Sequence, residues 1–100
     1  MASQELRKAS DAVDDAYRAY ATANGDGFSD HNWRGAYEAR EDGYAIAEEA
    51  FALPVEERED HIENAVEGLP TSEQELVSAS AYYRLIELVE VGAPKMAVAA

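Results

Sequence analysis

Cysteine is absent from the sequence, which excludes disulfide bonds and thiolate metal sites and leaves no signal for a redox compartment. Proline and glycine are scarce, at 3 and 6 residues in 100, while 47% of the residues are hydrophobic. This composition is that of an ordered globular chain. A chain of 100 residues forms one domain, residues 1–100, and hides roughly two-thirds of the surface that it exposes when unfolded.

Long hydrophobic runs are missing as well. No apolar stretch approaches the ~18 residues that a membrane-spanning helix needs. The segment 1–10 is polar and of mixed charge, without the apolar centre of a secretion signal. We therefore expect a protein that does not enter a membrane and stays in the cytoplasm.

Positive charge is the third shortage. The chain has 8 Lys and Arg against 21 Asp and Glu, a formal charge of -13 and a pI near 4.3. Direct binding to nucleic acid depends on cations at the phosphates, so it is excluded, and anionic membrane surfaces are excluded by the same sign. The remaining partners are basic proteins and metal cations. Alternatively the acids contact only water and salt, as on the solvated surface of a halophile's protein.

Helical periodicity runs through the chain, and no pattern with the period of two that marks a strand is present. Ser3 is a suitable N-cap for a first helix, Asn24-Gly25 a suitable end, and Gly68-Leu69-Pro70 a stop signal before the last helix. Pro54 separates the middle two helices. The sequence predicts an all-α bundle of four helices over residues 3–23, 30–53, 55–67 and 72–91, followed by a flexible tail, 95–100.

The second helix carries an aromatic stripe that we expect to face the core. Its members recur at spacings of 4, 3, 4, 3 and 4, and Arg40 on this stripe is expected to snorkel or to pair with a carboxylate. Ser29 or Asp30 is the expected N-cap. Gly35 and Gly43 inside the helix predict either a closely packed neighbour or a bend. The stripe consists of Trp33, Tyr37, Arg40, Tyr44, Ala47 and Phe51.

The third and fourth helices differ in how much apolar surface they carry. The third has only a thin apolar edge, formed by Val55, Ile62, Ala65 and Val66. The fourth is apolar nearly all round, so we expect it to be the central helix or to lie at an interface between copies of the chain. Two overlapping capping boxes predict its start, Thr71 with Gln74 and Ser72 with Glu75.

A glycine-rich stretch between the first two helices resembles an EF-hand calcium loop. With Gly27 at the sixth position of that loop, Asn24, Asp26 and Asp30 take ligand positions. The first and twelfth positions, which need Asp and Glu, hold Thr22 and Trp33. The stretch is therefore interpreted as a glycine turn that ends in an N-cap, with weak calcium binding as an alternative.

Catalytic motifs are absent. His31 and His61 lie beside acids without the paired Glu-x-x-His elements of a di-iron bundle or the H-E-x-x-H motif of a zinc protease, and no nucleophile elbow is present. Carboxylate pairs are plentiful, but acid–base catalysis requires one of them to be desolvated beside a pocket. We expect no enzyme activity, no cofactor and no metal.

The acids are unevenly distributed along the chain. The segment 38–75 contains 13 acids and 2 bases and so carries -11 of the -13 charges. On the third helix, acids at spacings of 4, 3 and 4 form a stripe ~16 Å long. Like charges at these spacings destabilise a helix, so folding alone does not select them. We expect the partner-binding residues to be Glu38, Glu41, Asp42, Glu48, Glu49, Glu56, Glu57, Asp60, Glu63 and Glu67.

In size, charge and helical content the chain resembles small acidic proteins that phages use against restriction or CRISPR complexes, and acidic four-helix immunity proteins that inhibit nuclease toxins. The resemblance implies an inhibitor that occupies the nucleic-acid-binding surface of a basic protein or nuclease, without a cofactor. Besides weak calcium binding, one other interpretation stays open. In it the chain is a structural or oligomer-forming helical protein, such as a homodimer through helix 72–91, and its acids serve only solubility.

Overall fold

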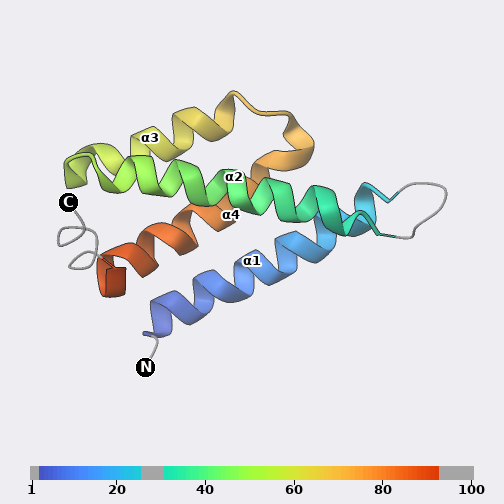
Figure 1. The fold of residues 1–100 in the computed structure, drawn as a ribbon, viewed down its shortest axis with the longest axis horizontal. Coiled ribbons are helices and arrows are strands. Elements are labelled where there is room, and N and C mark those ends of the chain that lie inside the picture. Colours follow the sequence, from blue (N-terminus) through green and yellow to red (C-terminus); the bar gives the residue numbers. More distant parts are fainter. Residues whose placement is uncertain (1–2, 26–30, 93–100) are drawn as a thin grey trace.

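The computed structural model describes residues 3–25 and 31–92, with side chains described up to residue 90, and within these ranges the protein is an all-α bundle (Figure 1). The four predicted helices are present, and a π-helical turn, η1, continues the last of them. In chain order the elements are α1 (Gln4–Ala23), α2 (Trp33–Phe51), α3 (Val55–Glu67), α4 (Thr71–Glu87) and η1 (Leu88–Gly92). The predicted tail, 95–100, lies outside the described residues.

Helix α4 is central, as predicted. It contacts α1, α2 and α3, whereas α1 and α3 share no contact within the described ranges. Figure 1 shows α2 and α4 crossing the middle of the bundle, with α1 along one side and α3 along the other. The buried residues of α4 include Leu76, Val77 and Ala81, each at most 1% exposed.

No helix of the described part is long and apolar enough to cross a membrane.

Local caps set both ends of α1, as the sequence indicated. The Ser3 hydroxyl accepts a hydrogen bond from the Leu6 N–H at 3.0 Å and so satisfies one of the free donors of the first turn. At the other end, Asn24 donates to the Tyr20 carbonyl twice, from its backbone N–H at 3.0 Å and from its side-chain amide at 2.9 Å. The helix therefore ends at Ala23.

The start of α2 lies later than predicted. The helix begins at Trp33, and Asn32 is its N-cap because the Asn32 side-chain oxygen accepts a hydrogen bond from the Gly35 N–H at 2.9 Å. Ser29 and Asp30, the expected caps, lie outside the described residues. The other end is close to the prediction, since the helix ends at Phe51, two residues before the expected Leu53.

The predicted buried face of α2 is only partly right, because Ala47 is the one member of the expected stripe that is buried, and Arg40, Tyr44 and Phe51 are half-buried. Small residues face the core: Ala36, Ala47 and Ala50 are fully buried. Trp33 and Tyr37 of the aromatic stripe are 48% and 50% exposed. The cause is the close approach of α4, which leaves no room for large side chains between the two helices.

Gly43 marks where α2 and α4 come closest. A Cβ placed on Gly43 would lie 2.6 Å from the Val77 carbonyl oxygen and 2.7 Å from the Ser80 Cβ. Of the two alternatives for a glycine inside this helix, the closely packed neighbour is the one observed. The α2–α4 seam, meaning the contact between these two helices around Gly43, is built from backbone and small side chains.

Helices α3 and α4 both begin directly after a proline, without a side-chain cap. The bounds of α3 agree with the prediction, but of its expected apolar edge only Ile62 is buried. Val55 is 72% exposed because it is the first residue of α3, where no other helix covers it. The predicted capping boxes of α4 do not form. The helix begins one residue earlier, at Thr71, and the Gln74 amide donates to the Leu69 carbonyl at 3.0 Å.

A candidate protein-binding surface

All ten acids predicted to bind a partner are exposed on α2 and α3. Solvation of a carboxylate is so favourable that an unpaired one is rarely buried, and no acid in the described part of the chain is buried. The accessible set is Glu38, Glu41, Asp42, Glu48, Glu49, Glu56, Glu57, Asp60, Glu63 and Glu67. These side chains do not form one continuous face, because the two helices point their acids in different directions.

Two acids of α2 face α4. Glu41 and Glu48 line a cavity of about 330 Å³ together with Arg84 and Glu87. Arg84 donates to Glu48 at 3.2 Å and also pairs with Glu87. Burial lowers the pKa of Arg84, but its hydrogen bonds to these two carboxylates outweigh burial and raise the pKa above the ordinary value. The charge of Glu48 is therefore compensated inside the protein.

The other acids of α2 lie along the edge that faces α3. Glu49 lies 3.5 Å from the His61 Nε2, which joins the two helices. Glu38 and Asp42 precede Glu49 at helical spacing and share this edge. Arg34 approaches Glu38 at 3.9 Å in a highly exposed pair, and exposed pairs of this kind contribute about 0–1 kcal/mol.

The acidic stripe of α3 lies on a different side of that helix from His61, which faces Glu49 of α2. Burial first, and then the charges of Glu63, Glu59 and Asp60, raise the pKa of Tyr82 on α4. Of these carboxylates, Glu59 lines a common cavity with Tyr82. The stripe itself consists of Glu56, Asp60, Glu63 and Glu67.

Arg58, the only Arg or Lys of α3, forms no ion pair with these acids among the described residues. Its Nε donates to the Leu53 carbonyl at 3.1 Å and its Nη2 to the Phe51 carbonyl at 3.2 Å. The guanidinium also lies 4.8 Å from the centroid of the Phe51 ring. Arg58 thus satisfies carbonyls at the end of α2, and no carboxylate of α3 forms an ion pair in the described part of the chain.

An apolar groove lies next to the stripe, between α3, the end of α4 and the start of α1. Its volume is about 380 Å³. Of its lining residues, Val55 and Val89 are 72% and 53% exposed. This groove was not predicted from the sequence, although the surplus of apolar positions on the last helix was its signal. The lining residues are Glu5, Val55, Arg58, Glu59, Tyr82, Leu85, Ile86, Val89 and Glu90.

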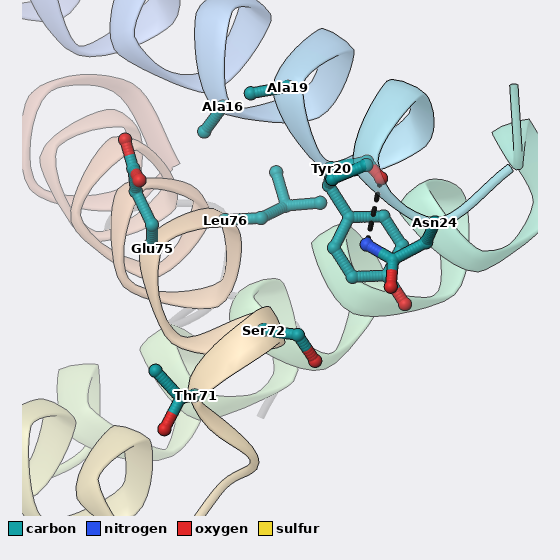
Figure 2. Close-up of a pocket in the computed structure, with 9 residues that line it drawn as sticks. Ala16, Ala19, Tyr20, Asn24, Thr71, Ser72, Glu75 and Leu76 are labelled. Carbon is teal, nitrogen blue, oxygen red and sulfur yellow. Dashed lines mark hydrogen bonds between the residues drawn. The ribbon is translucent and has the colours of Figure 1, made fainter.

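A second cavity, of about 410 Å³, lies between the end of α1 and the start of α4 (Figure 2). Ala16, Ala19 and Tyr20 line one side of it, and Thr71 and Ser72 lie on the other. Glu75 and Tyr20 are its only ionisable lining groups. One carboxylate and one phenol fall short of the three ligands that a metal site needs.

The aromatic stripe of α2 forms a partly exposed cluster around Arg40. The guanidinium lies 5.1, 5.3 and 5.8 Å from the ring centroids of Tyr17, Tyr37 and Tyr44. Of the two expectations for Arg40, the pair with a carboxylate is not found among the described residues. Arg40 stacks on the tyrosines instead, and its buried Nε has no hydrogen-bond partner there. Trp33 stacks on Tyr17 at 5.9 Å.

Metal ligation has no visible basis in residues 3–25 and 31–92, where no group of three or more His, Cys, Asp or Glu could hold an ion. Asp26 and Asp30 of the calcium-like stretch lie outside these ranges. His31, at the end of that stretch, stacks on Trp33 with the ring centroids 4.8 Å apart. The residue at the twelfth loop position is therefore part of the aromatic cluster.

No protein family matches the chain, and no curated protein or solved structure is significantly similar to it. The resemblance to acidic phage inhibitors and immunity proteins thus remains one of size, charge and helical content.

Proposed function

We propose that the protein is a non-enzymatic acidic inhibitor or adaptor of the cytoplasm. It binds a basic, nucleic-acid-binding protein through its carboxylates and blocks the nucleic-acid site of that partner, as an anti-CRISPR, anti-restriction or nuclease immunity protein would. The single observation that supports this is the orientation of Arg58. The only Arg or Lys of α3 donates hydrogen bonds to the Phe51 and Leu53 carbonyls at and after the end of α2, and six acids of the same helix are left without an ion-pair partner within the described residues.

Unpaired carboxylates on a rigid helix favour association with a basic surface. They attract it over a distance of about a Debye length, ~10 Å at 0.1 M salt, and they lose no internal ion pair when they bind. By contrast, Glu48 would have to give up Arg84 at 3.2 Å. We therefore assign the main contact to the acidic stripe of α3, and a secondary one to the edge of Glu38, Asp42 and Glu49.

The experiment compares two variants of equal charge in pull-downs from cell lysate at low and high salt. In one, the stripe loses three charges by Asp60→Asn, Glu63→Gln and Glu67→Gln. In the control, α1 loses three exposed charges by Asp11→Asn, Asp14→Asn and Asp15→Asn. The α3 variant is expected to lose a basic protein that the wild type and the α1 variant retain at low salt, and duplex DNA should release that protein.

Two outcomes would contradict the proposal. If both variants retain the same proteins, net charge alone causes the association and α3 has no special role. If no basic protein is retained even at low salt, the acids serve solubility, and the chain fits the structural interpretation better.

A further inference from the structure

We propose that the apolar groove beside the acidic stripe binds a basic amphipathic helix of the partner protein. This inference rests on the proposed function and adds a partner class and a second set of contacts. The floor of the groove consists of Tyr82, Leu85, Ile86 and Val89. Their spacing of 3, 4 and 7 residues from the first is that of one apolar face of a helix, which a second helix covers in helix-in-groove recognition.

Exposure of the groove shows that the described part of the chain leaves it uncovered. Val89 is 53% and Val55 72% exposed. Apolar surface gains roughly 25 cal/mol per Å² when it leaves water, so covering these side chains favours binding. A flat basic patch of an opposing protein would not reach into the groove, whereas a helix that presents Leu or Phe side chains would.

Carboxylates lie on both sides of the groove, so they favour an occupant with positive charge. Glu59 lines it on the α3 side, and Glu5 and Glu90 line it on the other. The Ser3 hydroxyl donates to the Glu90 carboxylate at 2.6 Å and holds that side chain in place. Arg58 also lines the groove, but its guanidinium is bonded to the Phe51 and Leu53 carbonyls.

A second copy of the chain fits this groove less well. Each copy carries a formal charge of -13, and pairing two copies here would bring the acids around both grooves together. A helix with Lys or Arg on both sides of an apolar stripe pairs with acids at both rims and covers the floor. Charge complementarity therefore selects a basic helix as the occupant.

The test measures binding of two labelled synthetic peptides by fluorescence anisotropy. One is a leucine–lysine peptide with its leucines on one helical face, and the other is an oligolysine with the same number of lysines. The wild type is expected to bind the amphipathic peptide at least about tenfold more tightly than the oligolysine. Val89→Asp and Val55→Asp should each weaken binding of the amphipathic peptide about tenfold and leave oligolysine binding unchanged or slightly stronger.

Adding an acid makes these variants informative. Electrostatics alone would strengthen binding of a basic peptide when the chain gains a negative charge, so a loss must come from the apolar contact. Tyr37→Asp is the matched control, because Tyr37 is 50% exposed and lies outside the groove. This variant should bind both peptides as tightly as the wild type or slightly more tightly, and circular dichroism checks that every variant keeps its helices.

Each remaining outcome overturns a defined part of the inference. If the two peptides bind equally and the groove variants behave like Tyr37→Asp, the groove is not used, while the proposed function survives. If neither peptide binds at low salt, the proposed function fails as well. If sedimentation shows a dimer that Val89→Asp dissociates, the occupant is a second copy. If Met96→Ser with Val98→Ser strengthens peptide binding, the end of the chain itself competes for the groove.

Discussion

The α2–α4 seam and helix α3 represent two ways of attaching a helix to the same core. In the seam, Gly43 and several alanines let two helices approach until backbone nearly touches backbone. Helix α3 is held by one fully buried side chain, Ile62, and by the bonds of Arg58 to carbonyls of α2. The seam fixes geometry through sterics, while most residues of α3 are exposed to solvent. The region available for binding is thus the one that contributes least to the core.

The largest effect is expected from removing the one buried side chain of α3. Ile62→Ala should lower the free energy of unfolding by about 2–5 kcal/mol, because it deletes buried methyl groups and leaves a cavity. Amide exchange should show protection lost first in α3, while the α2–α4 seam stays protected. Denaturant unfolding combined with hydrogen exchange measures both quantities.

Val55→Ala is the control for this change. Val55 lies on the same helix but is 72% exposed, so its truncation should shift stability by no more than about 0.5 kcal/mol. An equal loss of protection in α1, α3 and α4 after Ile62→Ala would mean that α3 is not a separately attached element, and the contrast between the two regions would disappear.

A smaller effect is expected from crowding the seam. Gly43→Ala places a methyl group 2.6 Å from the Val77 carbonyl oxygen, which belongs to backbone and cannot move aside. Overpacking lowers stability by about 1–3 kcal/mol. Alanine favours a helix over glycine by up to ~1 kcal/mol, which offsets part of that loss. The net loss should be up to about 2 kcal/mol in thermal or denaturant unfolding.

Gly68→Ala is the matched glycine. The nearest atom to its added Cβ is 3.8 Å away, and its φ of -78° suits any residue. The free energy of unfolding of this variant should be about 0.4–1 kcal/mol higher, because alanine restricts the unfolded chain. If Gly43→Ala stabilised the protein as much as Gly68→Ala does, the close packing of the seam would be refuted.

Both ends of α1 were predictable because a local signal decides them, and the buried face of α2 was not. Ser3 and Asn24 act through hydrogen bonds within four residues, so the sequence around them suffices. On α2, an aromatic stripe and an alanine stripe are both present at helical spacing. Which of them faces inward depends on how closely α4 approaches, and that is a tertiary property.

The candidate site divides in the same way. Exposure of the acids follows from the cost of burying a carboxylate, so it could be predicted. The direction of Arg58 could not, because it depends on where the carbonyls of Phe51 and Leu53 lie after α2 ends. The groove was partly predictable. The sequence indicated that the last helix carries excess apolar surface, but it did not indicate which side of that helix stays uncovered.

The smallest effect separates an unpaired acid of α3 from a paired acid of α2. Glu63→Gln removes repulsion with Glu59, Asp60 and Glu67, each worth ~0.2–0.5 kcal/mol at low salt, so it should stabilise the protein. Glu48→Gln breaks the pair with Arg84 and should destabilise it by up to about 1 kcal/mol. Thermal unfolding at low and high salt measures both, and screening should shrink both differences. If Glu63→Gln were destabilising at low salt, the α3 acids would already be compensated by the fold, and the reason for assigning them to a basic partner would be lost.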